Sequence, residues 1–140
     1  MQLYHHTLQF DVRDYECDLS GIVNNAVYQN YLEHARHQFL KSLEVDYSAW
    51  AQRGVHMVVI RSEIDYLSPL RSGDQFIIGT NPERVSRLRI AFRQDIYHLP
   101  DHKVILRAIF TCTAIDNAGR PRLPKELQAA FDQIFIERTP

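Results

Sequence analysis

One stretch of the sequence, Asp14–Tyr28, combines residue types that are suited to acyl transfer. Asp18 lies in a glycine-containing loop, seven positions before the expected start of the longest helix. The first turn of a helix offers unpaired N–H groups and the positive end of the helix dipole, which can stabilise an oxyanion. A carboxylate that faces such donors can attack a carbonyl carbon or activate a water molecule. An aspartate that only shapes a turn is the alternative interpretation.

The elements expected around this loop are a strand before it and a long helix after it. Residues 3–13 alternate apolar and polar side chains, which is typical of a half-buried strand. From Ala26 to about Leu43 the apolar residues fall on one helical face, whereas polar residues such as Arg36 fall on the others. Asn24 or Asn25 is expected to cap this helix. A short second helix is expected over residues 47–53.

The rest of the chain is expected to form sheet, followed by a helix from Pro124. Strands are expected at 55–67, 75–80, 85–97 and 104–115, with a tight turn at 68–74. In the 85–97 strand, Arg87, Arg89 and Arg93 alternate with apolar residues that face the other side. Strands joined by short turns pair antiparallel. The sequence therefore predicts one α+β domain over residues 1–140, with an antiparallel sheet wrapped around one long central helix.

The composition excludes several classes of protein. With 16 Lys plus Arg against 17 Asp plus Glu, the chain lacks the basic excess of a general nucleic-acid binder. Its 2 cysteines cannot form a disulfide scaffold or a four-thiolate zinc site. No apolar run approaches the roughly 20 residues of a membrane span, and the first residues do not resemble a secretory signal. A cytoplasmic protein is therefore expected.

Two other reactive patterns are weaker. The histidines of Glu33–His34–x–x–His37 are three positions apart, which is not the zinc-protease spacing, so no metal site is expected. Cys17 is expected to be a small core-facing residue and not a nucleophile, because adjacent residues in extended chain point to opposite faces. No cofactor is expected either.

The loop resembles a known active site. The string DLSGIVNN at residues 18–25, followed by Val27 and Tyr28, resembles the catalytic loop of hotdog-fold thioesterases of the 4-hydroxybenzoyl-CoA thioesterase family. Residues 66–74 (YLSPLRSGD) and 85–92 resemble further elements of that family, in the same order. The combined pattern is especially similar to the single-domain acyl-ACP thioesterases of plastids and cyanobacteria.

This resemblance implies roles for individual residues. Asp18 would be the catalytic carboxylate, as nucleophile or general base, and the backbone N–H of Asn25 would polarise the thioester carbonyl. Many relatives have His where this chain has Ile22, so a mechanism assisted by that His is not open to it. The arginines of the 84–93 region would bind CoA phosphates or the acidic face of acyl carrier protein. The expected substrate-binding residues are Gly21, Ile22, Val23, Asn24, Tyr28, Arg87 and Arg89.

The resemblance also implies an activity and an assembly. The expected reaction is hydrolysis of a fatty or β-ketoacyl thioester, on acyl carrier protein or on CoA, to a free acid and a thiol. An aryl-CoA hydrolase of the hydroxybenzoyl or dihydroxynaphthoyl type is the alternative, and a non-catalytic acyl-binding module is a third possibility. Because the family's site lies between subunits, a homodimer or homotetramer is expected. Acyl chain length, and attack by the carboxylate or by water, stay open.

Overall fold

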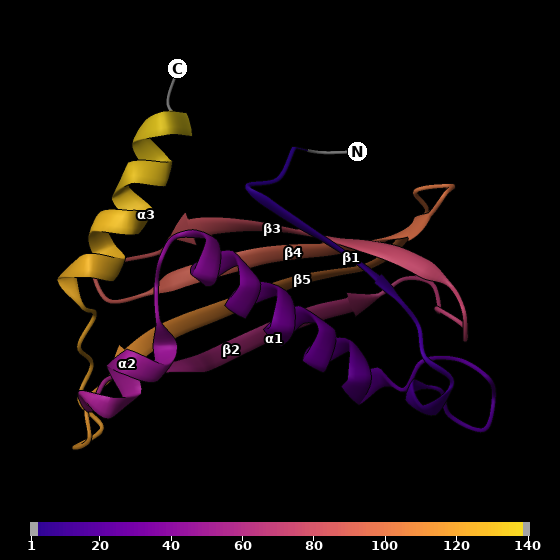
Figure 1. Cartoon of the computed structure of the whole chain (residues 1–140), viewed down its shortest axis with the longest axis horizontal. Coiled ribbons are helices and arrows are strands. Elements are labelled where there is room, and N and C mark those ends of the chain that lie inside the picture. Colours follow the sequence, from indigo (N-terminus) through magenta and orange to yellow (C-terminus); the bar gives the residue numbers. More distant parts are fainter. Residues whose placement is uncertain (1–2, 139–140) are drawn as a thin grey trace.

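A computed structural model describes residues 3–138, in which helix α1 lies across one face of a five-stranded antiparallel sheet (Figure 1). The strand order is β1-β3-β4-β5-β2, so β1 and β2 form the two edges. This arrangement is the expected α+β class. The elements are β1 (His6–Asp11), the 3₁₀ turn η1 (Asp14–Glu16), α1 (Asn25–Ser42), α2 (Tyr47–Gln52), β2 (His56–Tyr66), β3 (Gln75–Arg84), β4 (Ile90–Leu99), β5 (Val104–Ile115) and α3 (Lys125–Arg138).

The core lies between α1 and the sheet. The helix face that the sequence predicts to be apolar supplies the buried residues Tyr28, Leu32, Ala35 and Phe39. They repeat every three or four positions, so they form one stripe along the helix. Phe39 meets Phe92 of β4 edge to face, with ring centroids 6.3 Å apart. Burial of this stripe fixes how α1 lies on the sheet, and with it where α1 begins.

Arg36 departs from the sequence-based expectation, because it is buried and not on a solvated face. Its side chain is only 7% exposed. The guanidinium donates a hydrogen bond of 3.0 Å to Gln94 Oε1 and lies 4.1 Å from the centre of the Phe110 ring. Gln94 in turn donates to the backbone oxygen of Leu32 and to Thr80 Oγ1. These partners offset the cost of burying a charge, which the helical pattern alone does not reveal.

The boundary between β3 and β4 also differs from the prediction. β3 runs on to Arg84, and β4 begins at Ile90, so Arg87 and Arg89 lie in a turn and not in a strand. The N–H of Val85 donates to the oxygen of Arg89 and closes that turn. β3 continues through Pro82 because pairing with β1 stops at Thr80, and proline is tolerated where a strand has an open side.

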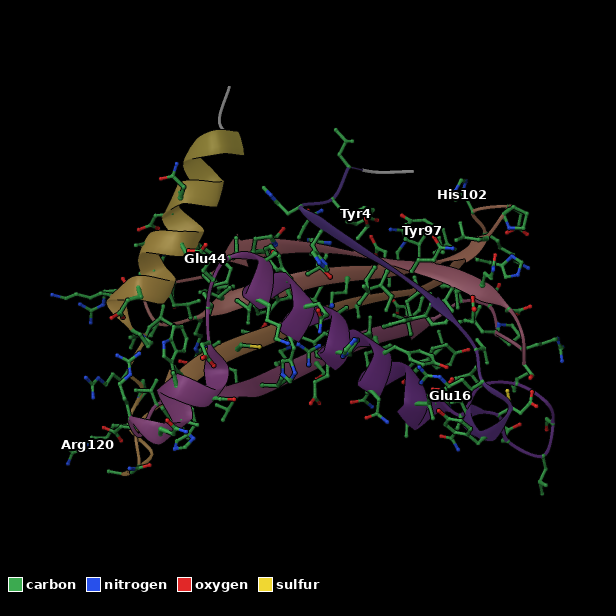
Figure 2. The ribbon with its side chains drawn as sticks, in the orientation of Figure 1. Tyr4, Glu16, Glu44, Tyr97, His102 and Arg120 are labelled. Atoms are coloured by element: carbon green, nitrogen blue, oxygen red, sulfur yellow. The ribbon has the colours of Figure 1, made fainter. Side chains whose placement is uncertain are left out.

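The two ends of α1 define two ends of the molecule. The part around the start of α1, with the loop that holds η1, is called here the Asn25 end; the part around α2 and the start of α3 is called the α2 end (Figure 1). Glu16 lies at the former, whereas Glu44 and Arg120 lie at the latter (Figure 2). None of the helices within residues 3–138 is both long and apolar enough to cross a membrane.

Candidate active site

Asp18 lies in a tight turn that its own side chain helps to form. Its N–H donates to the oxygen of Ile22 at 2.8 Å, and the N–H of Gly21 donates to the oxygen of Asp18 at 3.0 Å. Gly21 has φ +78°, a conformation that costs glycine little and other residues more. The exposed carboxylate accepts the Ser20 N–H on Oδ1 at 2.8 Å. Oδ2 has no hydrogen-bond partner within the described chain, so Asp18 both shapes the turn and keeps an oxygen free.

The start of α1 leaves one backbone donor free. Asn24 is the N-cap, and its side chain accepts the N–H of Ala26 at 2.9 Å. The N–H of Val27 donates to the oxygen of Asn24. The N–H of Asn25, which precedes these two groups, donates to no acceptor within residues 3–138. It is therefore available to an acceptor outside the chain, as the first turn of a helix allows.

A cavity of about 260 Å³ is lined in part by Asn25, the residue that carries this free N–H. The backbone of Leu70 links the 66–74 segment to the loop and to α1. Its oxygen accepts the N–H of Val23, and its N–H donates to the hydroxyl of Tyr28 at 3.0 Å. The segment at 66–74 thus lies against the 18–25 loop. Burial raises the pKa of Tyr28. The cavity is lined by Ile22, Val23, Asn25, Tyr28, Tyr66, Leu67, Ser68 and Pro69.

Four of the predicted site residues meet at this cavity, and others do not reach it. Ile22, Val23, Asn25 and Tyr28 are among its lining residues, whereas Asp18, Gly21 and Asn24 belong to the same loop and cap but do not line it. The far wall is formed by the end of β2, where Tyr66 is 45% exposed and its hydroxyl donates to the oxygen of Asn25 at 3.4 Å. β2 pairs with β5 alone, so this wall adjoins an open sheet edge.

The sequence pattern gave no indication of Glu16, which ties the loop to α1. Its carboxylate is almost fully buried, at 9% residue exposure. Oε1 accepts the hydroxyl of Tyr31 and the N–H of Arg13, both at 2.8 Å, and its backbone oxygen accepts the N–H of Asn24 at 3.1 Å. Burial and this hydrogen bond raise the pKa of Tyr31. Glu16 thereby fixes the position of the η1 turn, which precedes Asp18, relative to the N-terminal cap of α1.

The predicted carrier-binding arginines lie away from the loop. Arg84 and Arg93 each form an ion pair within the chain, with N–O distances of 2.6 and 2.8 Å. Arg87 and Arg89 are exposed in the β3–β4 turn. That turn lies at the α2 end, so one chain does not bring these arginines next to Asp18 (Figure 1). Their role in carrier binding remains a prediction.

The other candidate groups do not form a second reactive centre. Within residues 3–138, no three side chains of His, Cys, Asp and Glu are grouped so that they could hold a metal ion. Cys17 is half-buried and packs against the core, while Cys112 is buried. Burial raises the pKa of the Cys112 thiol to about 11, so it stays protonated near neutral pH.

The sequence is similar to those of known thioesterases. Residues 12–131 match the thioesterase-like superfamily. The chain belongs to this superfamily. It is 39% identical over 127 residues to the chloroplastic acyl-acyl carrier protein thioesterases ATL2 and ATL3 of Arabidopsis thaliana, a match that covers 90% of this chain and 68% and 67% of the two relatives.

The structural comparison agrees. The 1,4-dihydroxy-2-naphthoyl-CoA thioesterase from Synechocystis superposes with a TM-score of 0.87, over 92% of this chain and 96% of the other, at 18% identity. A likeness at that identity shows the fold. The hotdog fold and the expectation of a thioester hydrolase are thus confirmed for this superfamily member.

Proposed function

We propose that this thioester hydrolase cleaves fatty or β-ketoacyl thioesters carried on acyl carrier protein, and also accepts CoA thioesters. The observation that carries the proposal is that Asn25, whose N–H is free, lines a cavity together with Ile22 and Val23 of the Asp18 loop. The names of the two Arabidopsis relatives support the acyl carrier. Because no histidine lies between Asp14 and Tyr28, the proposed reaction depends on a carboxylate and backbone donors.

In the proposed mechanism, the thioester carbonyl oxygen accepts the N–H of Asn25, which stabilises the negative charge that develops during attack. Asp18 acts through the oxygen that Ser20 does not bind. It either attacks the carbonyl carbon, which expels the thiolate and leaves an anhydride for water to open, or takes a proton from a water molecule that attacks directly. Both routes yield a carboxylic acid and a thiol.

The proposed assembly is a homodimer formed through the free edge of β2. Two such dimers would form the alternative tetramer. β2 has eleven residues, and Val59 and Ile60 near its middle are 44% and 45% exposed. A long edge strand with exposed apolar residues invites pairing with another chain. A two-fold axis would make this contact identical on both sides. The second chain would then border the wall formed by Tyr66.

An aryl-CoA substrate is the second candidate. The rings of Tyr28 and Tyr66, with centroids 5.8 Å apart, both line the cavity and could pack against an aromatic acyl group. The Synechocystis neighbour is named for such a substrate. A preference for aryl-CoA over fatty acyl thioesters would replace the first candidate with this one.

The deciding experiment is release of free thiol from panels of acyl-ACP, acyl-CoA and aryl-CoA thioesters. We expect Asp18→Asn to lower kcat by about 10²- to 10⁴-fold, the usual effect of removing a general base. Asp11→Asn is the matched control, because Asp11 is exposed in β1, at the opposite sheet edge from β2, and lies outside the cavity. Undiminished turnover in Asp18→Asn would remove this residue from the mechanism, and no turnover of any thioester by wild type would leave an acyl-binding module.

The cellular location is also a proposal. A cytoplasmic location is what the sequence predicts, but the two plant relatives are named as chloroplastic proteins. One domain over residues 1–140 likewise stays a prediction.

A further inference from the structure

A second cavity lies at the α2 end, far from the Asp18 loop. It has a volume of about 370 Å³ and lies between α2, the segment after β5 and the first residues of α3. Trp50 and Leu123, both nearly inaccessible to solvent, form its apolar floor. Arg53, Arg122 and Lys125 contribute exposed cationic side chains. The cavity therefore joins an apolar surface to a positively charged rim.

The cations of this rim have no acidic partner. Among the side chains that the structure describes, neither arginine nor Lys125 forms an ion pair, whereas Arg84 and Arg93 of the sheet are both paired. Glu126 is the one carboxylate among the lining residues, so the rim carries an excess of positive charge. Arginine presents a planar fork of donors that matches phosphate oxygens. An anion of the phosphate type fits this rim.

Along one chain, this cavity is too far from Asn25 to share a small substrate with it. α2 precedes the His56 end of β2, whereas the Tyr66 end contacts Asn25. The ten residue steps between these ends span about 33 Å. In the proposed dimer, antiparallel pairing of two β2 edges sets the His56 end of one strand beside the Tyr66 end of the other. The basic rim of one chain then lies next to the Asn25 cavity of its partner.

We propose that Arg53, Arg122 and Lys125 bind the phosphate at the carrier end of the thioester's pantetheine arm. CoA and the prosthetic group of acyl carrier protein share this phosphate, so one basic rim can serve both carriers. This assignment rests on the proposed function for the identity of the ligand. It differs from the predicted carrier role of the β3–β4 turn, whose Arg87 and Arg89 do not line the cavity.

Calorimetric binding of phosphopantetheine and of pantetheine tests the proposal without any turnover. We expect the double variant Arg53→Gln/Arg122→Gln to bind phosphopantetheine about tenfold or more weakly than wild type, because two charge-assisted contacts are lost. Pantetheine, which lacks the phosphate, should bind both proteins equally. Lys41→Gln/Lys103→Gln removes two exposed charges outside both cavities and should behave as wild type. Equal affinity of the Arg variant and wild type for phosphopantetheine would overturn the proposal.

Kinetics separate this inference from the proposed function. With acyl-phosphopantetheine, the Arg53→Gln/Arg122→Gln variant should show a raised KM and a nearly unchanged kcat, while acyl-pantetheine should give wild-type values. Parallel acyl-CoA and acyl-ACP assays show which carrier depends on the rim. An unchanged KM for all phosphate-bearing substrates would overturn the inference and leave the hydrolase intact. Absence of hydrolysis by wild type would overturn the proposed function, and the binding experiment would still decide the phosphate site.

Discussion

The two ends of the molecule treat their polar groups differently. At the Asn25 end, the carboxylate of Glu16 is buried and bound by Tyr31 and by the backbone of Arg13, and what stays free is one amide N–H and one carboxylate oxygen. At the α2 end, three exposed cations surround an apolar floor and none is paired within the described chain. Groups with internal partners fix shape, whereas groups without them are open to a ligand. The comparison suggests chemistry at one end and recognition of charge at the other.

Among the substitutions that test this comparison, one that breaks the proposed β2–β2 contact between two chains should have the largest effect. Ile60→Lys puts a charge on the open edge of β2, where lysine disfavours strand pairing. We expect light scattering to show a shift from the mass of two chains to that of one. The rate of thiol release should fall by about 100-fold, since small misplacements of a site are costly.

Val85→Lys is the control for that substitution. Val85 is also an exposed apolar residue, but it lies in the β3–β4 turn and away from the edge. It should leave both mass and activity unchanged. An Ile60→Lys protein that remains dimeric and fully active would show that the two ends do not meet through β2.

Loosening the Asn25 end alone should have an intermediate effect. Tyr31→Phe removes a hydrogen bond to the buried Glu16 carboxylate, so we expect the free energy of unfolding to fall by about 1.5–3 kcal/mol. Because Glu16 also holds the cap of α1, kcat should fall more than KM changes. Urea unfolding and steady-state kinetics measure the two effects. Tyr15→Phe, at an exposed tyrosine beside Glu16 in η1, should change neither quantity. A Tyr31→Phe enzyme with wild-type stability and kcat would contradict the role given to the Glu16–Tyr31 hydrogen bond.

The smallest expected effect is a pH dependence of stability at the Asn25 end. His98 Nδ1 lies 2.7 Å from Asp101 Oδ1, and its Nε2 lies 3.6 Å from Asp74 Oδ1 in the 66–74 segment. The hydrogen bond to Asp101 is the main cause that raises the pKa of His98 above 6.5. The folded state therefore favours the protonated ring, and this contribution is complete below pH 6.5 and is lost as pH rises through the raised pKa. Urea unfolding between pH 5 and 9 should show a steeper loss in wild type than in His98→Gln, and identical slopes would refute the ion pair.

Local properties of the active-site loop could be predicted from the sequence. The sequence predicts the cap at Asn24 or Asn25 and a turn-rich stretch around Gly21 from residues within a few positions of one another, and the structure places the cap at Asn24. The resemblance of the loop, and not the local pattern, pointed to the N–H of Asn25. The apolar stripe of α1 and the positions of the strands along the chain follow from the same short-range patterns. The pairing of β2 with β5 does not, because the turn at 68–74 predicts that β2 pairs with β3. This local information, with the DLSGIVNN string, is what made the family recognisable.

Contacts between distant residues needed the tertiary structure. Arg36 carries a charge at a position that the helical pattern assigns to solvent, and its contacts with Gln94, 58 positions away, and with Phe110 help to make its burial tolerable. The pairing of Glu16 with Tyr31 depends in the same way on how α1 settles on the sheet. Burial and long-range pairing are set by packing, and packing has no local signature.

By itself, therefore, the sequence determined the chemical groups of the loop and the approximate start of the helix that follows it, because capping and turn formation are local. The tertiary structure decided that Arg87 and Arg89 lie at the opposite end from Asp18, and that Arg53, Arg122 and Lys125 gather around one cavity. Those positions depend on where the sheet brings segments that are far apart in the chain.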